Sequence, residues 1–438
     1  MIQTQTTPLY DQLLSHFHPE KFSAAPRVMQ LQAHGLESFK KTGFPTRRTE
    51  EWKYTPVGGF LRETYSLNGI DKQPALQPEW VAQAHIPGLD AIEIVLLNGV
   101  LQPIQSELPA TVKVQTLSYA LNDEKVQGFI GQNTALENAP FAALNTALFT
   151  DGLFIEIAPK AILEKPLHIT HIYTAEHSRM LQPRHLVVVH PSAQITLIES
   201  TVRTEAGARV FINSVSEVVV EENASCDHYM IQSTNESAAI VNQVDVGQKR
   251  HSVYTSYTFA MPGAALIRNN LNVDLNAAET ETHLYGLMVG RDKQLLDVHS
   301  FINHKEPNCQ SNEIFKTILR DESNGVFSGK VFVHQEAQKT NAFQQNNSLL
   351  LSDKATVNAK PMLEIFADDV RCSHGATVGQ LSREALFYLQ SRGIGEAAAR
   401  DLLVNAFAFE VTEKIKIPAL EAYVNELIVG KGVDAVMA

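Results

Sequence analysis

The feature that most constrains this chain is a long stretch, from about residue 151 to residue 370, in which apolar and polar side chains alternate. Leu271, Val273 and Leu275, for example, interleave with Asn272 and Asp274. Successive side chains of a strand point to opposite faces, so this period of two predicts half-buried strands. No amphipathic helix separates the strands, which argues against βαβ units.

This strand-rich stretch allows a sandwich, a barrel or a β-solenoid. A single sandwich usually takes about 100 residues, whereas the stretch spans about 220. A solenoid grows by stacking and has no such limit. The chain has no exact repeat, so only length and continuity favour the solenoid.

Helical patterns flank the strands on both sides. Thr7 with Pro8 predicts a helix start, and a second helical pattern stops at Gly43. After residue 380, Ser382 predicts the cap of a first helix, residues 396–409 carry an apolar face, and Pro418 predicts a third start. Helices at the ends of a solenoid would cover its open strand edges. The predicted domains are residues 1–150 (helical and mixed), 151–375 (β core) and 376–438 (helical).

Residues 44–55 are dense in charge around Trp52, one of only two tryptophans. We expect a docking turn in which Trp52 is buried and Arg47 and Arg48 pair with carboxylates. The alternative is a binding patch. Further on, residues 91–100 resemble a strand that runs into an Asn-Gly turn.

Composition excludes several classes of protein. The formal net charge of -12 argues against a nucleic-acid-binding protein, which would show a basic stripe. No apolar run reaches the ~18 residues of a membrane helix, and the first residues lack the pattern of a secretory signal. Three cysteines in 438 residues do not form a disulfide framework and suit a reducing compartment. We therefore expect a cytoplasmic protein with no membrane or nucleic-acid partner.

The candidate site lies where the strands give way to helices. Cys372 and His374 are soft metal ligands two residues apart, so in a strand they share one face. Gly375 allows close backbone approach, and Arg371 is expected to favour the Cys372 thiolate. A closed metal site needs about four ligands, so the others must come from elsewhere in the chain or from another protein. The alternative is a buried cysteine and a hydrogen-bonded histidine beside two turn aspartates, Asp368 and Asp369.

Other motifs carry less chemistry. Four further histidines are each expected to be either hydrogen-bonded within the fold or exposed on the surface, although together with Cys309 they could cluster. They are His283, His299, His304 and His334. Residues 324–330 lack the spacing of a phosphate loop and are expected to be a glycine-bearing turn between strands. No complete catalytic constellation is present.

Taken together, the motifs resemble those of the SUF-system scaffold proteins, SufB and SufD. The resemblance covers the last third of the chain densely and the N-terminal box separately. The matching segments are residues 44–55, 311–316, 325–333, 337–340, 349–352, 361, 363–365, 367–370, 372–377 and 388–394. The Cys-Ser-His-Gly sequence at 372–375 resembles the SufD branch. Asn346 stands where the SufB branch has a cysteine, so this chain lacks the scaffold's main thiol ligand.

The resemblance implies a mainly β fold, a right-handed parallel β-helix flanked by N-terminal and C-terminal α-helical domains. It implies a non-catalytic subunit that pairs with a SufB-like scaffold subunit and binds a SufC-like ABC ATPase through its C-terminal helices. A transient Fe–S cluster would form at the subunit interface, with His374 as a ligand and Cys372 as a weaker candidate. A homodimer is expected for the isolated chain, and the participation of a flavin stays open.

Two rival functions remain at this point. Some β-helix proteins are carbohydrate-active enzymes that use carboxylates such as the Asp368-Asp369 pair. Alternatively, the chain is a purely structural partner of an ATPase, with His374 merely packed. Turnover of a sugar substrate by the purified chain would identify the first rival. The iron and sulfide content of the assembled complex, with and without His374, would identify the second.

Overall fold

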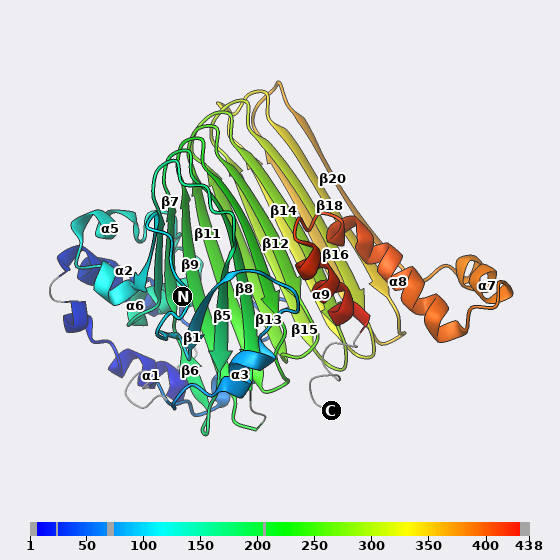
Figure 1. The fold of residues 1–438 in the computed structure, drawn as a ribbon, viewed down its shortest axis with the longest axis horizontal. Helices are drawn as coiled ribbons and strands as arrows, with labels where there is room; N and C mark the ends of the chain where they lie inside the picture. The colour runs from blue at the N-terminus through cyan, green and yellow to red at the C-terminus, as the bar shows by residue number, and fades with distance from the viewer. Residues whose placement is uncertain (1–6, 23–24, 68–73, 205–206, 430–438) are drawn as a thin grey trace.

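The computed structural model of the protein describes residues 7–22, 25–67, 74–204 and 207–429, in which two ten-stranded sheets face each other (Figure 1). From β7 onward, successive strands alternate between the sheets, and each pairs in parallel with the strand two positions along. This is a parallel β-solenoid with flanking helices, which confirms the predicted fold class.

Sheet A has its edges at β3 and β19. Its strands are β3 (Val112–Thr116), β4 (Leu153–Ile157), β6 (Arg179–Leu181), β7 (Arg184–Val189), β9 (Val210–Val220), β11 (Ala238–Gln248), β13 (Leu266–Leu275), β15 (Leu295–His304), β17 (Asn324–Val333) and β19 (Thr356–Ile365). Sheet B has its edges at β2 and β20. Its strands are β1 (Ile92–Leu97), β2 (Val100–Leu101), β5 (Leu167–Tyr173), β8 (Gln194–Arg203), β10 (Ser225–Gln232), β12 (Val253–Ala260), β14 (Glu281–Gly290), β16 (Gln310–Leu319), β18 (Asn341–Leu350) and β20 (Arg371–Gly379).

The interior between the sheets is the main apolar core. Alternate side chains of both sheets point into it, including Leu271, Val273 and Leu275, which are all buried. Corners between strands repeatedly use a polar residue in the left-handed conformation, such as Asn223 (φ 57) and Asp321 (φ 53). Asn and Asp tolerate that conformation better than other non-glycine residues, which explains the scattered Asn and Asp in the strand-rich sequence.

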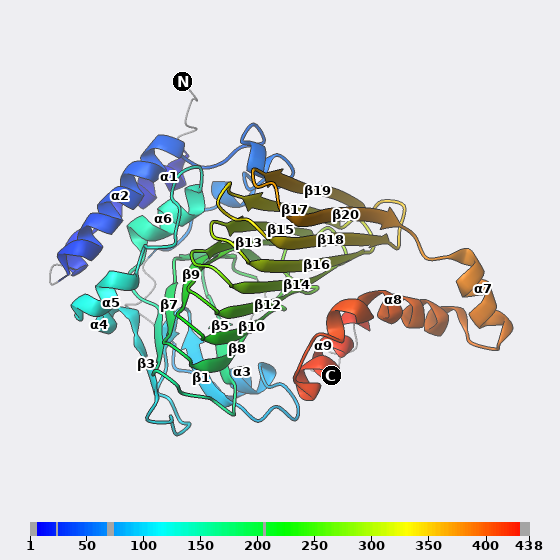
Figure 2. The same ribbon diagram turned by 90° about the horizontal axis from the view of Figure 1, so that it is seen from above.

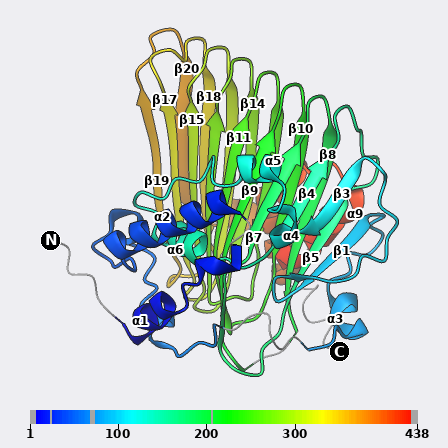
Figure 3. The ribbon, with the colours of Figure 1, turned by 90° about the vertical axis from the view of Figure 1, so that its left-hand side faces the viewer.

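N-terminal helices cover the outer face of sheet A near its first strands (Figure 3). The predicted start of the first helix is confirmed, because the Thr7 hydroxyl accepts a hydrogen bond from the Tyr10 amide. Gly43, with φ 63, ends the second helix as predicted. The N-terminal elements are α1 (Pro8–Ser15), η1 (Pro19–Phe22), α2 (Pro26–Thr42), η2 (Glu50–Trp52), η3 (Phe60–Arg62), α3 (Pro78–Gln83), α4 (Leu117–Ala120), α5 (Glu124–Phe129) and α6 (Pro140–Leu148).

The C-terminal helices are α7 (Arg383–Ser391), α8 (Glu396–Thr412) and α9 (Pro418–Val429), with Ser382 capping α7 and Pro418 opening α9 as predicted. Helices α8 and α9 pack on the outer face of sheet B through Val404, Val424 and neighbouring residues, whereas α7 projects away from the solenoid (Figure 2). Among the described residues, no helix is long and apolar enough to cross a membrane.

Two local predictions were wrong. Residues 324–330 form part of β17 rather than a turn; a Cβ at Gly329 would lie 2.3 Å from the Gln344 side chain, so this glycine makes room inside the solenoid. Trp52 is buried as expected, but within the described residues Arg47 and Arg48 are exposed and form no ion pair with a carboxylate.

Candidate functional site

The last turn of the solenoid has an unpaired edge in each sheet. Strand β19 pairs only with β17, and β20 only with β18, among the described strands. Nearly every residue of β20 is exposed, including the apolar Val378, and Phe366, which follows β19, is exposed as well. Long unpaired strands with exposed apolar side chains favour pairing with another chain.

Both predicted site residues lie on β20. Cys372 is partly buried and packs against the apolar interior. His374 shares its face of the strand by alternation, but is exposed because no further turn covers it. The histidine therefore lies at the open end of the solenoid, with its side chain accessible.

Burial raises the pKa of the Cys372 thiol. Loss of hydration outweighs the backbone hydrogen bond at Ala342, which favours the thiolate. The expectation that Arg371 would favour the thiolate is therefore wrong. The thiolate is the form that binds metal, so a raised pKa makes the Cys372 side chain less ready to bind a metal ion.

A row of polar side chains leads from the interior to His374. The register aligns Glu313 of β16 with Gln344 of β18, and Gln344 with His374 of β20. Adjacent strands lie about 4.8 Å apart, so the three residues form a short ladder. The Gln344 amide Nε2 donates to Glu313 Oε2 over 2.6 Å, and Gly329 leaves room for that amide.

Glu313 is fully buried, and this loss of hydration raises the pKa of its carboxyl to about 7. Other polar atoms nearby are buried and have no hydrogen-bond partner in the described part of the chain, among them Asn346 Oδ1, Ser348 Oγ and Thr317 Oγ1. The interior of the last turns is thus more polar than the apolar core behind it. Glu313 and Gln344 were not predicted to lie near His374, because only the strand register brings them into line with it.

The remaining candidates stay apart. Asp368 and Asp369 are exposed at the bend between β19 and β20, where the Asp369 amide bonds Gln338. Each further histidine has a partner of its own: His283 with Glu281, His299 with Glu51, His304 with Ser311 and His334 with Asn303. Cys309 is buried beside Thr280. Within the described part of the chain, no three His, Cys, Asp or Glu side chains are placed to hold a metal ion.

A second exposed apolar surface lies on the C-terminal helices. Helix α7 has no buried residue, and Phe387 and Tyr388 are 72% and 57% exposed. On α8, Leu402 and Phe409 are also exposed. By contrast, Lys316 of β16 fixes α8 to sheet B, since its Nζ lies 2.7 Å from Glu410 Oε2 and 4.4 Å from the centre of the Phe407 ring.

Comparison with known proteins agrees with these features. The family described as "SUF system FeS cluster assembly, SufBD core domain" matches residues 171–407, and "SufBD protein N-terminal region" matches residues 3–169. An iron-sulfur cluster assembly SufBD family protein of Synechocystis is 33% identical over 397 residues, covering 88% of this chain and 86% of that protein. Iron-sulfur cluster assembly protein SufD of Escherichia coli is 30% identical over 401 residues, covering 91% of each chain. Protein ABCI7, chloroplastic, of Arabidopsis thaliana is 29% identical over 418 residues, covering 90% of this chain and 85% of that protein. This chain belongs to the SufBD family of SUF-system iron–sulfur cluster assembly proteins, and within it to the SufD-like members.

Proposed function

We propose that this chain is a non-catalytic scaffold subunit that lends a ligand to a nascent Fe–S cluster at the open end of its solenoid. The observation that carries the proposal is the exposed imidazole of His374 on β20, a strand with one unpaired edge. A SufB-like subunit would cover that end, in the cytoplasm, and supply the remaining ligands.

Ligand chemistry favours sharing between two subunits. A closed site needs about four ligands, and β20 offers His374 and, more weakly, Cys372. A neutral imidazole can bind iron through one nitrogen while a neighbour holds the other. We infer that an imidazole ligand suits a cluster that is cargo and must be passed on.

The unpaired edges support pairing with the SufB-like subunit. Partner strands laid against β19 and β20 would satisfy their free backbone groups and cover Phe366 and Val378. The same edges would let the isolated chain form a homodimer, with a second copy in the partner's place.

The exposed aromatic surface of α7 supports binding of a SufC-like ATPase. Large apolar side chains are rarely exposed together without a partner, and Phe387 and Tyr388 are adjacent on a helix that buries none of its own residues. The packing of α8 against sheet B would transmit movement of the bound ATPase to the solenoid.

The test is His374→Ala in the complex assembled with both partners. We expect unchanged co-purification and a several-fold drop in iron and sulfide retained after anaerobic reconstitution, with a smaller drop for Cys372→Ala. His251→Ala is the matched control, because His251 is an exposed histidine at a corner far along the chain from β20.

Unchanged iron and sulfide content in His374→Ala would remove the ligand role. It would instead favour a purely structural partner of the ATPase.

A further inference from the structure

A cavity of about 560 Å³ lies on the outer face of sheet A, beneath residues 47–55 and away from the exposed histidine of β20. Four of its lining side chains are cationic: Arg47, Arg48, Lys53 and Lys360. Its carboxylates are Glu50 and Glu51. A local excess of positive charge stands out on a chain whose formal net charge is -12.

The two carboxylates are already engaged. Glu50 Oε1 lies 2.8 Å from the Lys360 Nζ, and Glu51 Oε2 lies 3.1 Å from His299 Nδ1. Arg47, Arg48 and Lys53 have no carboxylate partner among the described residues. Like charges repel by roughly 1 kcal/mol per pair at 4 Å even in water, so an anion between them would be stabilised.

The segment that carries these cations is held rigidly. Arg47 and Arg48 occupy the centre of a turn closed by the hydrogen bond from the Thr49 amide to the Thr46 carbonyl, 2.9 Å long. Trp52 anchors the segment, because its ring lies 3.8 Å from the guanidinium carbon of Arg268. Arg268 Nη1 also donates to the Glu51 carbonyl over 2.7 Å. A preorganised site binds at a lower entropic cost.

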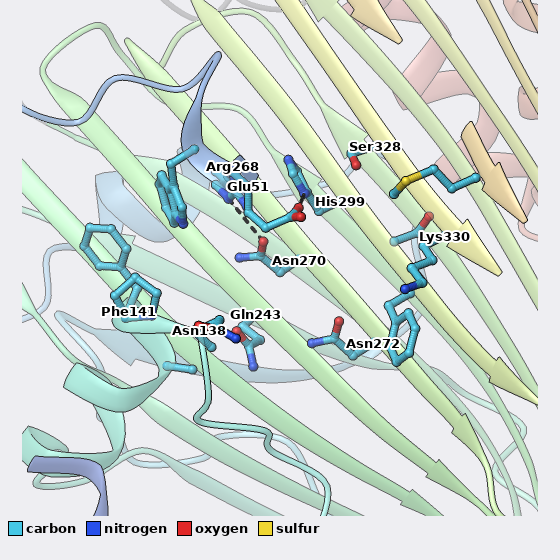
Figure 4. Close-up of a pocket in the computed structure, with 17 residues that line it drawn as sticks. Glu51, Asn138, Phe141, Gln243, Arg268, Asn270, Asn272, His299, Ser328 and Lys330 are labelled. Carbon is cyan, nitrogen blue, oxygen red and sulfur yellow. Dashed lines mark hydrogen bonds and ion pairs between the residues drawn. The ribbon is translucent and has the colours of Figure 1, made fainter. Parts of the chain in front are cut away.

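A smaller cavity of about 200 Å³ adjoins the first (Figure 4). Glu51, His299 and Ser328 line both, so they form the boundary between the cavities. Amide side chains and aromatic rings of the smaller cavity can hydrogen-bond and stack against a neutral polar group: Asn138, Gln243, Asn270, Asn272, Trp52 and Phe301. Two cations, Arg268 and Lys330, also line this cavity, and each is paired with a carboxylate, Asp297 and Glu364 respectively.

We propose that the larger cavity binds the phosphate groups of a small molecule. Arginine guanidinium groups bind phosphate oxygens through paired, charge-assisted hydrogen bonds, and the lining residues Lys53 and Lys360 add point charges. The adjoining amide-lined cavity accepts the neutral part of the ligand, as in a nucleoside diphosphate. This site is independent of the cluster ligand at the open end.

The test is calorimetric titration of the full chain at low salt with pyrophosphate, ADP and citrate. We expect pyrophosphate to bind and ADP to bind more tightly, because only ADP reaches the second cavity. Arg47→Ala/Arg48→Ala should weaken binding at least about tenfold, the loss expected for one or two charge-assisted hydrogen bonds. Lys40→Ala/Lys41→Ala removes the same charge from adjacent exposed residues outside the cavity and should leave affinity within about twofold.

One variant should strengthen binding. Glu50→Gln removes a negative charge from the cavity and frees Lys360, so pyrophosphate should bind about threefold more tightly. Equal binding of citrate and pyrophosphate, or equal losses in the two double variants, would overturn the phosphate assignment. If pyrophosphate and ADP bind with equal affinity, the second cavity does not contact the ligand, and the assignment of a nucleoside diphosphate is wrong. None of these readouts depends on cluster assembly.

Discussion

The two ends of the solenoid differ in how they are finished. At the first end, the edge strands β2 and β3 are short and antiparallel to their neighbours, and helices pack over sheet A. At the last end, β19 and β20 are long and parallel, and among the strands that the structure describes each is paired on one edge only. The helix nearest the last end in sequence, α7, buries nothing. Short or covered edges prevent unwanted pairing, and long bare edges invite it. The first end is thus closed to further strand pairing, whereas the last end is open to it, which supports the proposal that partners bind at the last end.

Ion pairs repeat this contrast. At the first end, Arg184 and Glu217 are both fully buried, with Arg184 Nη2 2.6 Å from Glu217 Oε1. The Gly131 amide also donates to Glu217. At the last end, Lys330 and Glu364 form a 2.9 Å pair whose side chains are 31% and 45% exposed.

The largest expected effect is therefore on stability at the first end. Glu217→Ala leaves the buried Arg184 charge unpaired and should lower the free energy of unfolding by about 3–5 kcal/mol. Glu364→Ala is the matched control and should cost less than about 1 kcal/mol, because exposed pairs contribute little. Urea denaturation measures both, and equal losses would contradict the contrast between the ends.

The second prediction concerns the polar interior of the last turns. Glu313 has its folded-state pKa raised from 4.5 to about 7. The folded chain thus holds this proton more tightly than the unfolded chain, so the carboxyl penalises folding progressively as pH rises from 4.5 through 7. Glu313→Gln removes the penalty and should gain about 2–3 kcal/mol over the parent chain between pH 5 and pH 8.

Urea denaturation at both pH values provides the measurement for Glu313→Gln. Glu364→Gln, an exposed carboxylate on β19, should show no gain that depends on pH. A Glu313→Gln difference that stays constant from pH 5 to pH 8 would refute the assignment of a neutral, buried carboxyl in the last turns.

The same contrast separates what the sequence predicts from what it does not. Period-two alternation, the caps at Thr7 and Ser382 and the helix-starting Pro418 are local signals, so the strands and these helix starts were predictable. The pairs Arg184–Glu217 and Glu313–Gln344 join residues 33 and 31 positions apart. Those offsets depend on the corner lengths of each turn, and the chain has no exact repeat from which to read them. The glycines of residues 324–330 predicted a turn for the same reason, since the neighbour of Gly329 cannot be read from the sequence. In the structure these residues form a strand, and Gly329 makes room for the Gln344 side chain.

The third prediction tests the unpaired edges directly. Phe366→Lys/Val378→Lys places two charges on apolar side chains that are 59% and 54% exposed at the last end. Burial of each original apolar side chain in the interface would contribute about 1–2 kcal/mol to binding. The double variant loses both contributions, so it should bind the SufB-like subunit about 100-fold more weakly. Tyr119→Lys/Ile162→Lys is the control. It alters two similarly exposed apolar residues that lie on α4 and between β4 and β5, and this variant should bind the SufB-like subunit normally.

Affinity measured by surface plasmon resonance, with sedimentation for the homodimer, reports the effect of Phe366→Lys/Val378→Lys. Both associations should weaken together, because the same edges are proposed to serve both. Loss of binding only in the Tyr119→Lys/Ile162→Lys variant would place the partner at the first end.

The smallest effect is expected for α7. Phe387→Ala/Tyr388→Ala removes two exposed rings and should weaken binding of the SufC-like ATPase about tenfold, since interface aromatics typically contribute 1 kcal/mol or more each. The free energy of unfolding should change by less than about 0.5 kcal/mol, because α7 buries none of its residues. Tyr119→Ala removes an equally exposed ring from α4 and should leave ATPase affinity unchanged. If the α7 variant binds the ATPase normally but loses stability, then α7 packs against this chain and only the solenoid edges are built for partners.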